Sequence, residues 1–306
     1  MSVLHALLRR PTPERPGPGP MPDALLRALD VQVGRRMDSL LAGDYRSSRH
    51  GDGSELAQVR SYVPGDDVRR IDWNVTARTG EPHVRVQLAE RVLVSWLVLD
   101  TSASMEFGTA DRRKADVAEG VALALGQLAT RRGNRLGIVT FGDARPRTIA
   151  PRQGRAGLLG LLTSLRGERA PAARPSLAEA LERTRSIARQ RGLVVVVSDF
   201  RGPLDWRPQL LELAGGHDVV AVEIRDPREQ ELPNAGDLWL VDPETGRQLR
   251  VDTRSAKLRQ RFAAAAAEER SGLARVLSSL GVRHVVLSTE GDWLRTLAVF
   301  LRRRTR

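Results

Sequence analysis

The sequence of 306 residues contains no cysteine, which excludes disulfide bonds, cysteine-ligated zinc and thiol nucleophiles. Aromatic residues make up only 4% of the chain, so stacking platforms for nucleic-acid bases are not expected. Long apolar runs are missing as well: none approaches the roughly 20 residues that span a bilayer. The apolar part of residues 1–10 is too short for a signal peptide. We therefore expect a cytoplasmic protein, which partners could bring to the periphery of a membrane.

Lysine is nearly absent, and neither Lys114 nor Lys257 follows a glycine. This excludes a Gly-x-x-x-x-Gly-Lys-Ser/Thr phosphate loop, so ATP hydrolysis by the chain itself is not expected. The five histidines lack the paired spacing of metal ligands and are His5, His50, His83, His217 and His284. The net charge of +12 comes almost entirely from arginines that are dispersed among acidic residues. Such dispersion favours a solvated surface over a nucleic-acid site, which stays open as an alternative.

The composition changes along the chain in a way that predicts four regions. Residues 1–22 are rich in proline and glycine, and we expect them to be a disordered N-terminus. Over 23–43, apolar residues recur at three- and four-residue spacing, which predicts a helix ended by a glycine. Residues 44–91 contain two strand-like segments and are expected to form a small β-rich subdomain. Residues 92–306 form the remaining region.

From residue 92 onward, strand patterns alternate with helix patterns. Strands are expected at 92–99, 136–141, 147–150, 193–197, 218–224 and 282–287, and helices at 112–131, 154–165, 176–190, 205–214, 255–280 and 293–303. A hairpin is expected to interrupt this alternation near 236–252. The pattern predicts an α/β fold, with a mostly parallel sheet covered by helices on both faces.

The apolar run that begins at Val92 reads as a buried strand, and polar side chains alternate just after it. Alternate residues of an extended segment point the same way, so Asp100, Ser102 and Ser104 should converge beyond the strand end. Their oxygens are hard ligands that suit Mg²⁺ or Mn²⁺. A capped turn between a strand and a helix would account for the same residues.

Two later positions favour the metal site over the capped turn. Asp199 follows the strand at 193–197, and Ser176 begins the helix before that strand. In open α/β sheets, ligands bind beyond the carboxyl ends of the strands, at the point where the strand order reverses. We therefore predict that Asp100, Ser102, Ser104, Ser176 and Asp199 form a Mg²⁺ or Mn²⁺ site completed by water.

A short segment within 44–91 crowds opposite charges around a Pro-Gly pair, which predicts a type II turn. Its notable residues are Arg60, Tyr62, Pro64, Gly65, Asp66, Asp67, Arg69, Asp72, Trp73 and Arg78. From the residues alone, this charged segment is a solvated turn braced by surface ion pairs that contribute little.

These motifs resemble known families. Asp100-Thr101-Ser102-Ala103-Ser104 resembles the metal-ion-dependent adhesion site of von Willebrand factor A-like domains. Ser176-Leu177-Ala178-Glu179-Ala180-Leu181, with Ser in place of the usual Thr, and Val197-Ser198-Asp199 resemble two further motifs of those domains. The charged segment is similar to the bacterial "domain of unknown function 58" family. The resemblance implies a Rossmann-like von Willebrand factor A-type domain preceded by a small β-rich domain.

The resemblance also implies a function. Members of that family are often encoded beside MoxR-type AAA+ ATPases and are thought to act with them as adaptors. It implies a metal-ion-dependent protein-binding adaptor, not an enzyme, in a chaperone-like or complex-maturation role. A client would supply an acidic residue to the metal, and the charged segment would be a second contact surface or a brace. The open alternatives are a Mg²⁺-dependent hydrolase and an arginine-rich, nucleic-acid-associated structural module.

Overall fold

The computed structural model describes residues 16–27, 29, 55–88, 94–131, 134–142, 147–152, 176–243 and 245–302. The chain divides into two compact units, which are considered separately below. The larger unit combines Met1–Met37 with Leu93–Arg306, and the smaller unit is Asp38–Val92. Some of the predictions fall outside the described residues: residues 1–15, most of the predicted helix at 23–43, and the predicted helix at 154–165.

A six-stranded sheet in the order β10-β7-β6-β3-β4-β5 forms the centre of the larger unit. Its strands are β3 (Val94–Asp100), β4 (Arg135–Phe141), β5 (Thr148–Arg152), β6 (Leu193–Ser198), β7 (Asp218–Arg225) and β10 (Arg283–Ser288). Every neighbouring pair is parallel except β4 and β5. The predicted mostly parallel sheet, with an edge strand near 147–150, is confirmed.

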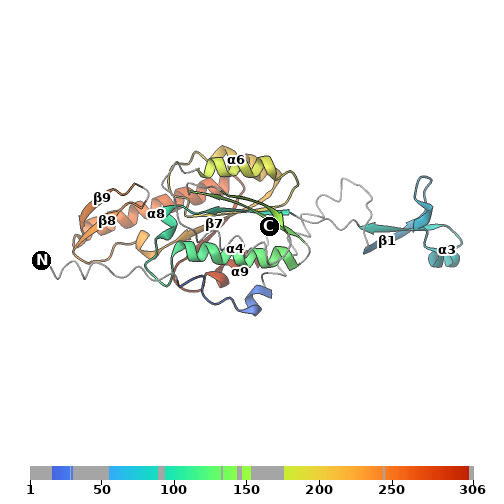
Figure 1. Ribbon diagram of the computed structural model, residues 1–306, viewed down its shortest axis with the longest axis horizontal. Helices are drawn as coiled ribbons and strands as arrows, with labels where there is room; N and C mark the ends of the chain where they lie inside the picture. Colours follow the sequence, from blue (N-terminus) through green and yellow to red (C-terminus); the bar gives the residue numbers. More distant parts are fainter. Residues whose placement is uncertain are drawn as a thin grey trace. The chain divides into compact units, whose positions relative to one another are not determined.

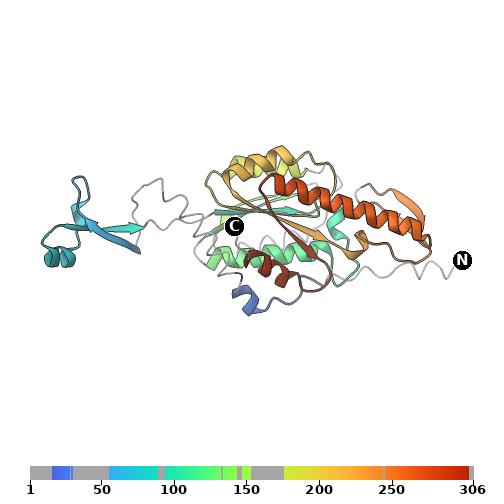
Figure 2. The ribbon, with the colours of Figure 1, turned by 180° about the vertical axis from the view of Figure 1, so that it is seen from behind.

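Helices cover both faces of this sheet, as Figures 1 and 2 show. They are α4 (Lys114–Arg131), α6 (Leu177–Ile187), α7 (Arg207–Gly216), α8 (Ala256–Ser279) and α9 (Trp293–Arg302). Side chains of α6, α7 and α8 share one core cluster with β3 and β6, whereas α4 and α9 lie on the opposite face. Strand β6 is buried along its whole length, as its unbroken run of valines predicts for a central strand. The α/β fold class is confirmed.

The strand order reverses between β3 and β6. The chain leaves β3 through α4 to reach β4 on one side, and it returns to β6 on the other side of β3. The carboxyl ends of β3 and β6 therefore form the topological switch point, where ligands bind in sheets of this type.

The predicted hairpin is confirmed: β8 (Asp237–Val241) pairs antiparallel with β9 (Gln248–Asp252). Residues 16–22 of the predicted disordered N-terminus lie among the described residues. The indole N–H of Trp293 donates a 2.8 Å hydrogen bond to the carbonyl of Pro18, and Leu26 is buried just beyond. A proline-rich segment without internal hydrogen bonds can contact the folded chain in this way when one of its carbonyls finds a donor on a neighbouring helix.

The smaller unit is built on two antiparallel strands, β1 (Glu55–Ser61) and β2 (His83–Leu88). A short 3₁₀ helix, η2 (Val68–Arg70), and a helix, α3 (Trp73–Thr79), lie between them. The predicted Pro-Gly turn is present, with Gly65 at φ 109° and the Asp66 N–H bonded to the Val63 carbonyl at 3.0 Å.

Helix α3 was not predicted. It begins at Asp72, whose carboxylate accepts hydrogen bonds from the N–H groups of Asn74 and Val75, and it ends at Gly80 in the left-handed conformation. Its seven residues are too few to show a helical apolar period. Only these capping residues at its ends signal it in the sequence.

Candidate metal centre

Asp100 lies at the carboxyl end of β3 and is only 6% exposed. One carboxylate oxygen accepts the Ser102 N–H at 2.9 Å, and the other accepts the hydroxyl of Ser198 at 2.5 Å. Ser198 is the last residue of β6, so the two central strands are joined through this carboxylate. The orientation of Asp100 is fixed before any ligand arrives.

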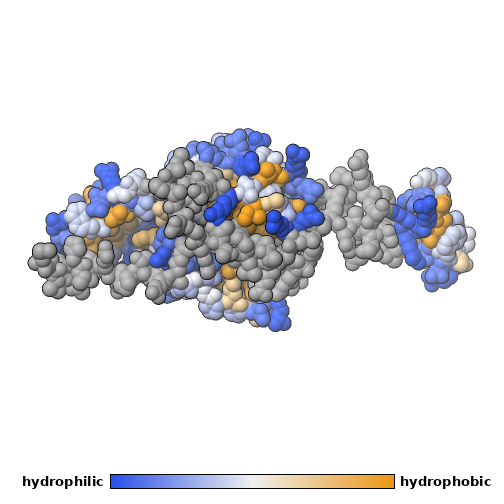
Figure 3. Space-filling view, in the orientation of Figure 1, coloured by the Kyte–Doolittle hydropathy of each residue, from blue (hydrophilic) through white to orange (hydrophobic). Residues whose placement is uncertain are grey.

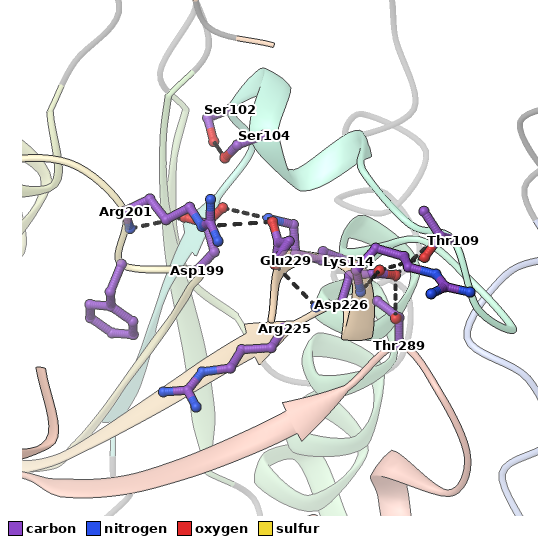
Figure 4. A network of polar contacts seen from close by, with 12 residues as sticks. Ser102, Ser104, Thr109, Lys114, Asp199, Arg201, Arg225, Asp226, Glu229 and Thr289 are labelled. Atoms are coloured by element: carbon purple, nitrogen blue, oxygen red, sulfur yellow. Dashed lines mark hydrogen bonds and ion pairs between the residues drawn. The ribbon is translucent and has the colours of Figure 1, made fainter. Parts of the chain in front are cut away.

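The hydroxyl oxygens of Ser102 and Ser104 lie 3.0 Å apart, side by side above Asp199 in Figure 4. With Mg–O bonds of about 2.1 Å at right angles, neighbouring ligand oxygens of an octahedral site are about 3.0 Å apart. The two hydroxyls are within hydrogen-bond distance of each other, and the same spacing suits two adjacent ligands of Mg²⁺.

The loop that carries these serines is held against the end of β4. Both the N–H and the hydroxyl of Thr101 donate to the Phe141 carbonyl, at 2.9 and 2.7 Å. Gly142 follows with φ +80°, and a Cβ there would lie 2.7 Å from the Cβ of Ser102. Only glycine allows this close approach in that conformation.

Asp199 follows β6 directly and is also buried. Its carboxylate accepts the Arg201 N–H at 3.1 Å, while the next residue, Phe200, has a positive φ of 52°. A bulky residue in the left-handed region is strained, and such strain gathers at functional sites. The Phe200 N–H donates to the Ser198 hydroxyl at 2.9 Å, which helps to hold this turn.

A buried lysine binds Asp199. The Lys114 ammonium donates to Asp199 at 2.6 Å and to Glu229 at 2.7 Å, and the lysine has no exposed surface. Glu229 comes from η4 (Pro227–Glu229), which follows β7. Figure 4 shows the ammonium between the two carboxylates. A third strand end therefore contributes to the candidate site.

The two aspartates have opposite pKa shifts. Burial first, and the negative charge of Asp199 second, raise the pKa of Asp100 to about 6. Burial would also raise the pKa of Asp199, but the charge and hydrogen bond of Lys114 outweigh it and lower that pKa. Hydrogen bonds from Ser102 to Asp100 and from Ser104 to Asp199 join all four residues into one cluster.

Four of the five predicted ligands are therefore brought together: Asp100, Ser102, Ser104 and Asp199. Ser176 is the N-cap of α6, where its hydroxyl accepts the Glu179 N–H at 3.2 Å as part of a capping box. Its role as a metal ligand stays a prediction.

The cluster fits a small divalent cation by the chemistry of its donors. Within the described ranges, no group of three or more histidine, aspartate or glutamate side chains is placed to hold a metal ion. A metal at this site would therefore depend on the serine hydroxyls together with the two aspartates. Hydroxyl and carboxylate oxygens favour Mg²⁺ or Mn²⁺ over Zn²⁺.

Sequence analysis did not identify Lys114 and Glu229 as part of the site. A signal for Lys114 exists, because it precedes Val117, Ala118 and Val121 on the buried stripe of α4. A lysine on such a stripe needs a buried partner.

Next to Glu229, Asp226 is buried and accepts hydrogen bonds from both the N–H and the hydroxyl of Thr109 and from the hydroxyl of Thr289. Although burial opposes it, these bonds lower the pKa of Asp226. Asp226 thereby ties the end of β7 to the loop before α4 and to the end of β10.

A pocket of about 280 Å³ adjoins the cluster and shares Asp199 and Glu229 with it. Phe200, Leu204 and Leu273 supply apolar parts of its lining. Charged side chains, among them Arg201, Arg225 and Arg270, line it as well, so the hollow beside the buried charges has both apolar and charged walls.

The charged segment of the smaller unit is bonded mainly within itself. Arg60 forms a two-pronged ion pair with Asp66, both bonds at 2.7 Å, and Arg85 binds Asp72 at 2.9 Å. Asp67 caps η2. The predicted turn braced by surface ion pairs is present.

Other residues of that segment face solvent: Pro64, Arg69, Trp73 and Arg78 are exposed, Trp73 by 69%. Tyr62 is half-buried, and its N–H donates to the Pro82 carbonyl. The assignment of this segment as a contact surface or a brace stays a prediction.

Among the helices of the described ranges, none is both long and apolar enough to cross a membrane. Figure 3 shows hydrophilic and apolar side chains interspersed on the visible face. Several arginines are engaged by acids, such as Arg113 with Glu106 and Arg225 with Glu223.

Solved structures similar to this chain include the conserved hypothetical protein BatB from Bacteroides thetaiotaomicron, with a TM-score of 0.41 and 15% identity. That match covers 68% of this chain and 95% of BatB. The SpRpn10 VWA domain matches with a TM-score of 0.39 and 14% identity, over 68% of this chain and 94% of that domain.

Relatives in sequence are found in mycobacteria. An uncharacterized protein of Mycobacterium tuberculosis is 42% identical over 287 residues, which covers 92% of this chain and 90% of that protein. An uncharacterized protein of Mycobacterium bovis has the same identity and coverage. The family model described as "Protein of unknown function DUF58" matches residues 58–272. The chain therefore belongs to the DUF58 family, as its motifs predicted.

Proposed function

We propose that this protein is a metal-ion-dependent protein-binding adaptor. A Mg²⁺ or Mn²⁺ ion is held by Asp100, Ser102, Ser104 and Asp199, with Ser176 as a further ligand. An acidic side chain of a client completes the coordination of the ion. The adaptor couples that client to a MoxR-type AAA+ ATPase, as the family resemblance implies.

The observation that carries the proposal is the pair of hydroxyl oxygens 3.0 Å apart beside two buried carboxylates at the switch point. These oxygens come from a loop fixed at both ends, so the ligands are positioned in advance. The two carboxylates neutralise a divalent ion and the hydroxyls add no further charge, so an open coordination position can take an acidic side chain from outside.

The charges of the cluster also favour a divalent cation. Asp100, Asp199 and Glu229 carry three negative charges when ionised, whereas Lys114 supplies one positive charge within the cluster and Arg201 lies 3.7 Å from Glu229 at its edge. A divalent ion would offset the negative charge of the two aspartates. It would also remove the repulsion between the two aspartates that raises the pKa of Asp100.

The surroundings of the cluster support a protein ligand over a small substrate. The adjoining pocket offers apolar side chains, Phe200, Leu204 and Leu273, and arginines to the residues next to the acidic side chain. In the smaller unit, exposed Trp73 and Arg69 provide a second contact surface for the ATPase or the client.

The test is a pull-down of a cognate MoxR-type ATPase and its clients by the full chain, with and without EDTA. We expect binding to require the divalent ion and to be lost in Asp100→Asn. The control variant Glu182→Gln removes an exposed carboxylate of α6 and should bind like the wild type. Binding that persists both in EDTA and in Asp100→Asn would exclude the metal-bridged mechanism.

The two alternatives give different results in simple assays. A hydrolase would release phosphate or acid from model esters with Mg²⁺ or Mn²⁺, and Asp100→Asn would abolish that release. A nucleic-acid-binding module would bind DNA or RNA with an affinity that falls steeply with salt and ignores EDTA. The ion pairs of Arg60, Arg85 and Arg113 with acids disfavour the second alternative.

A further inference from the structure

Lys114 is the most unusual residue of the site. It is completely buried, and its ammonium lies between Asp199 and Glu229, as Figure 4 shows. Lysine is almost never fully buried in proteins unless it is paired. The only other lysine of the chain, Lys257, is exposed. The buried position of Lys114 therefore calls for a reason within the cluster.

The position of Lys114 is set by three separate parts of the chain. Lys114 is the first residue of α4, Asp199 follows β6, and Glu229 follows β7. The Phe107 ring lies 6.0 Å from the ammonium and lines its other side. The ammonium is thus an internal cation at the edge of the candidate metal site.

The ammonium and a divalent ion would share Asp199. Lys114 already occupies one oxygen of that carboxylate, at 2.6 Å. A divalent ion bound to the same carboxylate would lie a few ångströms from the ammonium, and the two cations would repel each other in surroundings largely shielded from water. Each cation therefore weakens the binding of the other.

We propose that Lys114 is a resident cation that limits the affinity of the site for divalent metal ions. Without the metal, it pairs Asp199 and Glu229 and keeps two buried carboxylates from repelling each other. With the metal bound, it makes the complex weaker than the oxygen ligands alone would allow. This inference deepens the proposed function and rests on it.

A consequence for function follows from this arrangement. A site that binds its metal only weakly gains more from a further anionic ligand than a site that is already saturated. The metal and the acidic residue of a partner would then bind cooperatively. Lys114 would make partner recognition depend on both.

The experiment compares Lys114→Met with the matched control Lys257→Met in the full chain. Mn²⁺ is titrated into each protein and the free ion is followed by electron paramagnetic resonance. We expect Lys114→Met to bind Mn²⁺ at least about tenfold more tightly than the wild type, because a buried positive charge is removed. Lys257→Met should match the wild type.

Thermal unfolding adds a second readout. Without metal, Lys114→Met removes the buried cation that binds both Asp199 and Glu229, so its melting temperature should fall. Saturating Mg²⁺ should raise that melting temperature by more than it raises the wild type's. If Lys114 only stabilised the fold, Lys114→Met would melt at a lower temperature without metal. Mg²⁺ would then raise its melting temperature by no more than it raises that of the wild type.

The outcomes separate this inference from the proposed function. Equal Mn²⁺ affinity in Lys114→Met and wild type overturns the role of Lys114 and leaves the metal site standing. No Mn²⁺ binding to either protein overturns both.

If Lys114→Met does not fold, Glu229→Gln replaces it in the same titration. Lys114 then faces Asp199 alone and competes more strongly for it, so Mn²⁺ affinity should fall. Unchanged or tighter binding in Glu229→Gln contradicts the inference.

Discussion

The molecule contains two clusters of opposite charges that differ mainly in burial. In the larger unit, Lys114 binds Asp199 and Glu229 at 2.6 and 2.7 Å with little or no exposed side-chain surface. In the smaller unit, Arg60 binds Asp66 at an equal 2.7 Å, but both side chains are partly exposed. Ion-pair distance therefore does not distinguish them. Exposed pairs contribute little to stability, whereas breaking a buried pair is costly.

The two clusters also differ in how far they reach along the chain. Arg60 and Asp66 are six residues apart, whereas Lys114 and Asp199 are 85 apart. A local pair braces one turn, while the distant pair joins separate elements at the switch point. A buried ion pair that joins distant elements can mark a candidate functional site, whereas a local, exposed ion pair does not.

The largest expected effect comes from breaking the buried pair. Asp199→Ala leaves the Lys114 ammonium buried with Glu229 as its remaining partner, so the free energy of unfolding should fall by about 3 kcal/mol. Denaturant unfolding measures this loss. The double variant with Lys114→Met should lose less than the sum of the two single variants, because both remove the same interaction. Additive losses would show that the pair is not coupled.

Gly142→Ala is expected to have the next largest effect. The new Cβ would lie 2.7 Å from the Cβ of Ser102 at a backbone φ of +80°, so stability should fall by about 2 kcal/mol. Ser102 would also be displaced, and Mn²⁺ affinity should fall. Gly202→Ala is the control, since φ there is +107° but nothing lies within 4 Å of its Cβ. Gly202→Ala should lose stability while keeping Mn²⁺ affinity.

Asp226→Asn is expected to lower the free energy of unfolding by about 1–2 kcal/mol at neutral pH, since a buried carboxylate loses bonds from Thr109 and Thr289. The hydrogen bonds lower its pKa in the folded chain, so the folded state binds a proton less readily than the unfolded state. Its contribution is full above the pKa of an unfolded aspartate, about 3.9, and is lost as the pH falls through the folded pKa.

The difference between wild type and Asp226→Asn should therefore be largest near neutral pH and shrink below about pH 4. Urea unfolding at a series of pH values measures it. A difference that grows in acid would contradict the assigned pKa shift.

The smallest effect is expected at the exposed pair. Asp66→Asn should shift the melting temperature by less than about 2 °C, and by less still in high salt. A large shift that is insensitive to salt would mean that the exposed pair contributes as much to stability as the buried pair. It would contradict the expected difference between the two clusters.

The elements and the local part of the site could be predicted from the sequence for a physical reason. Buried parallel strands read as apolar runs, and β6 with its four valines is bounded almost as predicted. Asp100, Ser102 and Ser104 converge because alternation in an extended segment is a local property. Asp199 could be predicted from the rule that ligands bind beyond the carboxyl ends of parallel strands.

The rest of the site and the order of the strands could not be predicted, because they depend on which distant elements become neighbours. Nothing local in the sequence shows that Glu229, at the end of η4, meets Lys114, the first residue of α4, so their pairing at the site was missed. The order β10-β7-β6-β3-β4-β5 is likewise a matter of pairing between distant strands. The hydrogen bond from Trp293 to Pro18 could not be predicted for the same reason, since it joins two distant parts of the chain.

The most direct test of the central claim is the stoichiometry of metal binding. Mn²⁺ titration of the full chain, followed by electron paramagnetic resonance, should show one ion per wild-type chain, with the site retained in Glu182→Gln and lost in Asp100→Asn. The same number of ions bound with the same affinity by wild type and Asp100→Asn would contradict a metal site at the end of β3.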